Sequence, residues 1–177
     1  MALPLPPRPD WRGLGTQFAS RALDHGRPAL LLLPMERRIL IADDDADVRQ
    51  GAAELLGSAG LEVMLAGDGE EAICLVRRAV ELGTPLHLAL MDVHMPPPVE
   101  APPVSMDGED GGLALFSLLR GSRPDLPCIL WSGEASQGVE SWALREGASA
   151  FLRKPVKPLI LREEIQRVLK LHWGAAG

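Results

Sequence analysis

The sequence has little of three features that would each define a class of protein: cysteine, positive charge and long apolar runs. Its 177 residues include only two cysteines, Cys74 and Cys128, too few for a disulfide framework and typical of a reducing cytosol. Acidic residues outnumber basic ones by 24 to 18, whereas a surface that coats nucleic acid needs excess positive charge. The longest apolar run, residues 29–33, is far shorter than the ~18 residues of a membrane span. We therefore expect a cytoplasmic protein that binds neither nucleic acid nor a membrane.

The prolines show where the folded part of the chain lies. The length suits one globular domain. Of the 16 prolines, six lie in residues 4–34 and five in residues 96–103. Proline removes a backbone donor and fixes φ, so both stretches resist helix and sheet. We predict a proline-rich N-terminal extension over residues 1–35, one domain over residues 36–172 with an insertion at 97–111, and a tail at 173–177.

The extension allows several interpretations. A signal peptide would need a basic start, an apolar core and a small-residue cleavage site, but here prolines come first and the apolar run ends in Leu33-Pro34-Met35. We favour a disordered leader over a signal peptide or a docking tail. A natural start at Met35, just before the first predicted strand, is a further hypothesis.

Short apolar runs alternate with longer amphipathic ones from residue 37 onward. The runs predict strands at residues 39–42, 61–66, 86–91, 128–131 and 150–152, and the helical periodicity predicts helices at 48–59, 70–82, 112–120, 139–146 and from 158 to 169. We expect Asp45 or Asp47 to cap the first helix, and both cysteines to be small buried residues. The alternation implies a parallel sheet with helices on both faces, whose ligand site lies beyond the carboxyl ends of the strands.

Polar residues follow several of these strands directly and should meet at that edge. They are Asp43 and Asp44 after the first strand, Asp92 after the third, Ser132 after the fourth and Lys154 after the fifth. Crowded carboxylates repel one another, and Mg²⁺ resolves the repulsion because it binds carboxylate, water and phosphate oxygens. A lysine and a hydroxyl nearby would complete a cradle for a phosphoryl group while a carboxylate attacks in line. The edge is suited to accept a phosphoryl group on an aspartate.

Four segments, in order, resemble the CheY-like receiver domain of bacterial response regulators. They are ILIADDD at residues 39–45, LMDVHMP at 90–96, ILWSG at 129–133 and GASAFLRKP at 147–155. The resemblance covers residues 36–171. It implies a flavodoxin-like α/β fold, a five-stranded parallel sheet of order 2-1-3-4-5 with helices on both faces.

The resemblance also implies the chemistry of the site. Asp92 would be the phosphoacceptor, receiving its phosphoryl group from a histidine kinase or a histidine phosphotransfer protein. Mg²⁺ would bind Asp44 and Asp92 directly, Asp43 through water, and the backbone carbonyl of His94. Lys154 would pair with the phosphate.

A conformational switch is implied as well. Ser132 would move toward the phosphate on activation, and Phe151 would swing inward and report that movement. Pro155 would follow a cis peptide bond. Activation would leave a monomer or form a weak, phosphorylation-dependent dimer in the region of Trp142 and Arg145.

Two features depart from the family pattern or stay open. The insertion at 97–111 stands where the family has a few residues, and it is interpreted as a disordered excursion, a lid or a partner-docking segment; its composition favours disorder. The His94 side chain is interpreted as a solvated loop histidine, with tuning of water access or binding of Mn²⁺ or Zn²⁺ as alternatives.

The leading functional hypothesis is a stand-alone response regulator of a two-component phosphorelay, not an enzyme, which signals through a separate, unknown output partner or by onward phosphotransfer. A phosphate-independent adaptor with a receiver-like fold is the alternative. A haloacid-dehalogenase-type phosphatase is set aside, because its D-x-D-x-[TV] motif fits neither Asp43, with Asp47 at the fifth position, nor Asp45, with Arg49 there.

Overall fold

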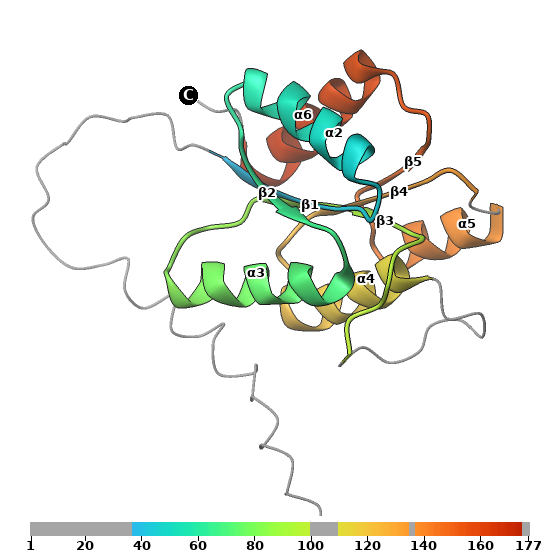
Figure 1. Ribbon diagram of the computed structural model, residues 1–177, viewed down its shortest axis with the longest axis horizontal. Coiled ribbons are helices and arrows are strands. Elements are labelled where there is room, and N and C mark those ends of the chain that lie inside the picture. The colour runs from blue at the N-terminus through green and yellow to red at the C-terminus, as the bar shows by residue number, and fades with distance from the viewer. Residues whose placement is uncertain (1–36, 100–109, 135–136, 175–177) are drawn as a thin grey trace, which may run out of the picture. The chain divides into compact units, whose positions relative to one another are not determined.

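The computed structural model describes residues 37–99, 110–134 and 137–174, all within a unit that spans Pro34–Gly177. In this part of the chain five strands alternate with five helices (Figure 1): β1 (Arg38–Ala42), α2 (Ala46–Ser58), β2 (Glu62–Ala66), α3 (Gly69–Glu81), β3 (Leu88–Asp92), α4 (Gly111–Ser122), β4 (Cys128–Ser132), α5 (Gln137–Arg145), β5 (Ala150–Arg153) and α6 (Pro158–Trp173). The predictions for residues 1–35 and for residues 100–109 of the insertion fall outside the described residues.

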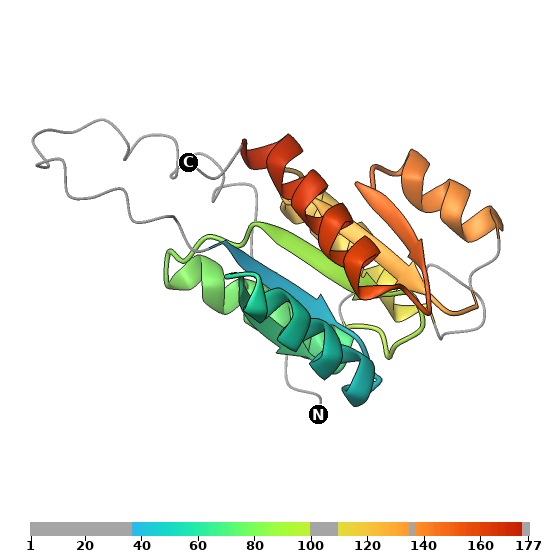
Figure 2. The ribbon, with the colours of Figure 1, turned by 90° about the horizontal axis from the view of Figure 1, so that it is seen from above.

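The strands form one parallel sheet in the order β2-β1-β3-β4-β5, which confirms the predicted fold class. Helices α2 and α6 cover one face, and α3, α4 and α5 cover the other (Figures 1 and 2). The predicted bounds agree with the observed ones to within a few residues, and α6 extends furthest beyond its prediction. None of the described helices is both long and apolar enough to cross a membrane.

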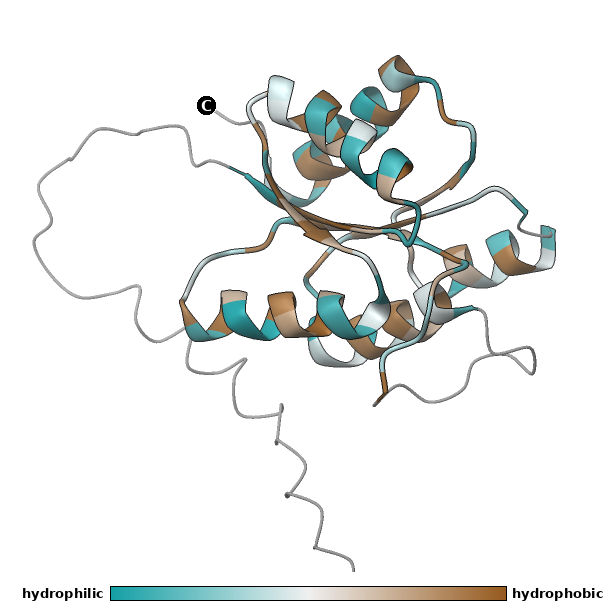
Figure 3. Cartoon of the chain, viewed as in Figure 1, coloured by the Kyte–Doolittle hydropathy of each residue, from teal (hydrophilic) through white to brown (hydrophobic). Residues whose placement is uncertain are grey.

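Alternating strand residues divide the core into two apolar layers. Leu40 and Met91 face the layer under α3, α4 and α5, while Ile41 and Leu90 face the layer under α2 and α6. Every residue of β3 is buried, as a central parallel strand covered on both faces requires. Figure 3 shows the strands as largely hydrophobic and the helices as alternating between hydrophobic and hydrophilic residues.

Local capping fixes the first turn of α2 next to the site edge. The Asp45 side chain accepts hydrogen bonds from the backbone N–H groups of Asp47 and Val48, so Asp45 is the N-cap and Asp47 is not. A capped helix start satisfies donors that have no partner within the helix. The cap therefore restrains the end of the β1–α2 turn that joins α2, and this turn carries Asp43 and Asp44.

The two cysteines differ, and the prediction for one of them is wrong. Cys128 is buried in β4, and burial raises the pKa of its thiol to about 12, so it is a poor nucleophile. Cys74 is exposed, because the buried face of α3 is formed by Ala72, Ile73 and Val76 and position 74 points away from that face. Helical spacing, rather than residue type, decides its burial.

Candidate functional site

Three carboxylates meet at the carboxyl edge of the sheet. Asp43 and Asp44 follow β1, and Asp92 is the last residue of β3, the strand paired with β1. One oxygen from each carboxylate lies within 4.8 Å of the others. Asp43 and Asp92 are buried, whereas Asp44 is exposed. The structure thus brings together the three side chains predicted to hold a metal, with one of them open to solvent.

Lys154 extends into this cluster from the end of β5. Its Nζ donates a hydrogen bond to Asp43 Oδ2 at 2.6 Å and lies 3.2 Å from Asp92 Oδ1. The second contact is an ion pair to a buried oxygen, and its angles fall outside those of a hydrogen bond. A single ammonium therefore faces two buried carboxylates and offsets only part of their charge.

Burial dominates the electrostatics of both buried carboxylates. Removal from water raises the pKa of Asp43 and of Asp92 above the usual range, and the charge of Lys154 opposes the shift without cancelling it. Ionising both groups at neutral pH therefore costs free energy in the folded protein. A bound divalent cation would remove that cost.

The donor set suits Mg²⁺. All three side chains offer carboxylate oxygen, the hard ligand that Mg²⁺ prefers. Asp92 Oδ1 is a buried acceptor that lacks a hydrogen bond within the described part of the chain, and exposed Asp44 leaves room for the waters that Mg²⁺ retains. The residues present therefore fit the ion that the fold family binds at such an acidic site.

Ser132 lies at the carboxyl edge of the sheet and Phe151 lies in the neighbouring strand β5. Ser132 makes no hydrogen bond to the three carboxylates among the described residues. Ser132 ends β4, is buried, and its Oγ accepts a hydrogen bond from the N–H of Glu134 at 3.2 Å. Phe151 is half-buried in β5 against the layer of α3, α4 and α5. The Lys154–Pro155 peptide bond is cis.

His94 is held by the end of the insertion. Its Nδ1 lies 3.3 Å from Asp110 Oδ1, and its Nε2 is buried without a hydrogen-bond partner in the described segments. The His94 side chain is 41% exposed, which agrees with the interpretation as a solvated loop histidine, although one ring nitrogen is paired with Asp110 and the other is shielded from solvent. The side chain is not a member of the carboxylate cluster.

Arg49 belongs to the site region and was missed by the sequence analysis. Its guanidinium donates a hydrogen bond to the backbone carbonyl of Asp43 from the first turns of α2. This contact ties the turn that carries the acidic pair to the helix behind it. The sequence held one signal for this contact: Arg49 lies about one helical turn after the Asp45 cap, so its side chain starts close to the turn that carries Asp43.

Pro96 and the first residues of the insertion are docked against α3. Within the docked segment, residues 96–99, the carbonyl of Pro96 accepts a hydrogen bond from Gly69 N–H at 2.9 Å. Val99 N–H donates to Glu70 Oε2 at 2.9 Å, and Pro98 is buried. The prediction of disorder is therefore wrong for this end of the insertion.

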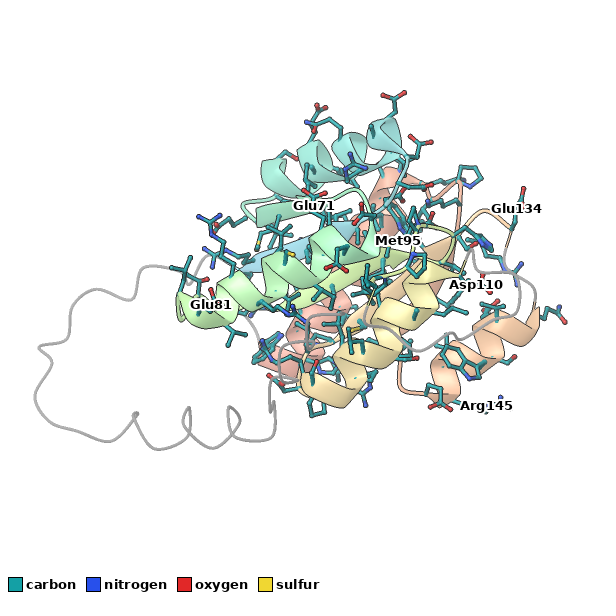
Figure 4. The ribbon with its side chains drawn as sticks, turned by 60° about the horizontal axis from the view of Figure 1, so that its bottom comes forward. Glu71, Glu81, Met95, Asp110, Glu134 and Arg145 are labelled. Atoms are coloured by element: carbon teal, nitrogen blue, oxygen red, sulfur yellow. The ribbon has the colours of Figure 1, made fainter. Side chains whose placement is uncertain are left out.

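The other end of the insertion is equally ordered. Asp110 forms an isolated parallel bridge with Met95, and Gly111 N–H donates to the Met95 carbonyl at 3.0 Å (Figure 4). Gly111 is also the first residue of α4 rather than the last of the insertion. Both ends of the insertion are thus anchored beside the loop that follows Asp92.

Gly69→Ala is expected to lower the free energy of unfolding by about 2 kcal/mol. A Cβ at Gly69 would lie 2.4 Å from Pro98 Cδ and 2.7 Å from Pro98 N, so the docked segment would have to move. Urea denaturation measures the effect. Gly57→Ala in α2 is the control, because a Cβ there meets nothing within 4 Å and should raise helix stability by up to ~1 kcal/mol. Equal stability of the two variants would show that residues 96–99 are not docked in solution.

The sequence and the fold both match known proteins. The model of the response regulator receiver domain family matches residues 39–166. The transcriptional regulatory protein AruR of Pseudomonas aeruginosa is 31% identical over 78% of this chain and 50% of its own length. The transcriptional activator protein ExaE of Pseudomonas putida is 32% identical over 76% and 56%. The chain spans about half the length of these curated relatives.

Solved structures agree with this assignment. A CheY-like response regulator receiver domain protein from Methanospirillum hungatei has a TM-score of 0.63 and 29% identity over 77% of this chain and 95% of its own. The receiver domain of NtrX from Brucella abortus has a TM-score of 0.62 and 28% identity over 75% and 98%. The family match covers most of the chain, and the sheet has the strand order 2-1-3-4-5 that the resemblance implied. The protein therefore belongs to the response regulator receiver domain family.

Proposed function

We propose that this chain is a phosphoryl-accepting signalling protein of a two-component phosphorelay, with Asp92 as the phosphoacceptor. One observation carries the proposal: the buried Asp92 carboxylate lies within 4.8 Å of the Asp43 and Asp44 carboxylates, and its Oδ1 is 3.2 Å from Lys154 Nζ. A purely structural aspartate would be paired with donors, not buried beside two further carboxylates that repel it. The donor is the phosphohistidine of a histidine kinase or of a histidine phosphotransfer protein.

The residues around Asp92 have different roles in phosphoryl transfer. Asp43, Asp44, Asp92 and the His94 carbonyl would hold Mg²⁺, which when bound supplies positive charge to the phosphoryl oxygens. An Asp92 carboxylate oxygen attacks phosphorus in line, the P–N bond of the phosphohistidine breaks, and the imidazole leaves as its nitrogen takes a proton from solvent. Lys154 neutralises charge on the transferred group.

The signal then passes through a change in the hydroxyl and aromatic residues beside the site. Ser132 exchanges its bond from Glu134 N–H for one to a phosphoryl oxygen, and Phe151, half-buried in β5, follows inward. This changes the surface of β5 and α5 that a partner contacts. The predictions of a stand-alone arrangement, a monomer or weak dimer, cytoplasmic localisation and no binding to nucleic acid stay predictions.

Incubation with acetyl phosphate and Mg²⁺ is expected to add one phosphoryl group per chain, detected by intact mass. The reason is that a small donor presents the same phosphoryl group to Asp92 as a phosphohistidine does. Asp92→Asn should show no adduct because an amide is not a nucleophile at this site. Asp125→Asn, which removes an exposed carboxylate outside the cluster, should be labelled like the parent chain.

Chelation of the metal separates the two candidate functions further. With EDTA in place of Mg²⁺, the adduct should fall to background, because the carboxylate cluster then repels the donor. A folded parent chain that acquires no phosphoryl group at any donor concentration would contradict the proposal. That result would favour the phosphate-independent adaptor instead.

A further inference from the structure

The residue directly before Ser132 is a tryptophan whose ring lies against the site lysine. The Lys154 Nζ stands 4.8 Å from the centroid of the Trp131 ring, within the ~6 Å range of cation–π attraction. Trp131 is only 3% exposed, so water competes little for the ammonium on that side. We propose that the Trp131 ring is a platform that positions Lys154 for phosphoryl transfer, an inference that rests on the function proposed above.

The sheet places the ring between the strand of the phosphoacceptor and the strand of the lysine. Trp131 is in register with Asp92 on β3 and with Leu152 on β5. A lysine side chain is a flexible four-carbon stem. The strands β3, β4 and β5 are adjacent and hydrogen-bonded, so Trp131 has a fixed place relative to Asp92 and to the end of β5 that carries Lys154. The ring therefore limits where the end of the lysine side chain can lie.

Three contacts define the position of the ammonium. Asp43 Oδ2 lies 2.6 Å from Nζ, Asp92 Oδ1 lies 3.2 Å from it, and the ring supplies the third side. The two carboxylates alone would leave the ammonium free to swing about the line that joins them. The aromatic face limits that swing to positions above the ring without adding a further hydrogen-bond acceptor, which would compete with the phosphoryl group.

The Trp131 ring also belongs to the apolar layer under α2 and α6, but filling that layer does not by itself require an indole. The indole Nε1 of Trp131 is buried and has no hydrogen-bond partner among the described residues, and an unpaired buried donor lowers stability. Ile129 and Leu130 occupy the preceding positions of β4 with no polar atom to satisfy. The indole has an electron-rich face, which among aromatic side chains attracts a cation most strongly. This attraction to Lys154 offsets the cost of the unpaired N–H.

The platform also allows the lysine to change partners during transfer. In the structure the hydrogen bond of Lys154 goes to Asp43, whereas the proposed function requires an interaction with a phosphoryl oxygen on Asp92. Attraction to a ring face is not directional in the way a hydrogen bond is, so Nζ stays favourably placed as it moves. The ammonium therefore need not be rehydrated between the two positions.

Lysine ε-methylene signals in NMR spectra test the contact without any phosphoryl donor. The chain has only three lysines, Lys154, Lys157 and Lys170, and exposed Lys157→Arg and Lys170→Arg assign the third signal by elimination. A group above an indole ring is shielded, so we expect the Lys154 signal upfield of the other two. Trp131→Phe should retain part of this shift, and Trp131→Leu should lose it.

The rate of labelling by acetyl phosphate at saturating Mg²⁺ tests the positioning role. We expect Trp131→Leu to react about tenfold more slowly and Trp131→Phe to stay within about threefold of the parent chain. Calorimetric Mg²⁺ affinity should be unchanged in both, because the group that the ring holds is the Lys154 ammonium, which is not a metal ligand. Trp131→Met, which fills space with a flexible side chain, replaces the leucine variant should that one not fold.

Phe116→Leu is the matched control, because it removes a fully buried ring from the other layer of the core. It should alter neither the NMR shift of Lys154 nor the labelling rate at saturating Mg²⁺.

The inference is overturned if Trp131→Leu keeps the Lys154 shift, if it reacts at the parent rate, or if Trp131→Phe is as slow as Trp131→Leu. A parent chain that takes no phosphoryl group contradicts the proposed function, while loss of the shift in Trp131→Leu would still support the platform.

Discussion

Gly112→Ala is expected to lower the free energy of unfolding by about 3 kcal/mol and to slow phosphorylation of Asp92. A Cβ at Gly112 would lie 1.7 Å from the backbone oxygen of Asp92 and 2.6 Å from its carbonyl carbon. Gly112 N–H also donates to the Val93 carbonyl at 3.0 Å. Because the clash is with backbone atoms, no side-chain rotation relieves it, and the phosphoacceptor itself must move.

The measurement is urea denaturation together with the labelling rate from acetyl phosphate. Gly121→Ala lies in the same helix, where a Cβ meets nothing within 4 Å, and it should be neutral or stabilise by up to ~1 kcal/mol. A Gly112→Ala variant as stable and as reactive as Gly121→Ala would show that α4 does not approach Asp92 as closely as the structure places it.

Asp92→Asn is expected to raise the stability of the metal-free protein at pH 7. Burial raises the pKa of Asp92 above its usual value of 3.8, so the unfolded chain ionises this group at lower pH than the folded protein does. Its contribution to stability is complete below pH 3.8 and is lost as the pH rises through the folded pKa. Asparagine keeps the shape of the side chain and carries no charge to bury.

The same substitution should remove the stabilisation that Mg²⁺ gives. A ligand that binds only the folded state adds about 2.7 kcal/mol at about 100 times its Kd, and Asp92→Asn deletes one of the three carboxylates that would hold it. Thermal unfolding in EDTA and in Mg²⁺, repeated between pH 4 and pH 7, measures both effects.

The pH series supplies the internal check. The advantage of Asp92→Asn in EDTA should grow as the pH rises above 3.8 and be small at the acid end. Exposed Asp125→Asn should show neither the gain in EDTA nor the loss of the Mg²⁺ effect. A metal-free Asp92→Asn variant less stable than the parent chain at pH 7 would mean that the Lys154 ion pair outweighs the burial of the carboxylate.

Local patterns along the chain were enough to predict the order of the elements and the edge at which the site lies. Apolar runs of strand length, amphipathic runs of helical period and an Asp45 cap are local signals, because their energies depend on residues within a few positions of one another. The carboxyl ends of parallel strands share one edge, so the placement of Asp43, Asp92 and Lys154 followed from topology alone.

Tertiary structure decided what depends on close approach between distant segments. The 2.6 Å contact of Lys154 with Asp43 joins residues 111 positions apart, and the Trp131 ring under that lysine depends on the register of β3, β4 and β5. The docking of residues 96–99 on Gly69 depends on a missing Cβ. Composition predicted disorder there because it counts residue types, whereas burial and hydrogen bonding depend on which surface a segment meets.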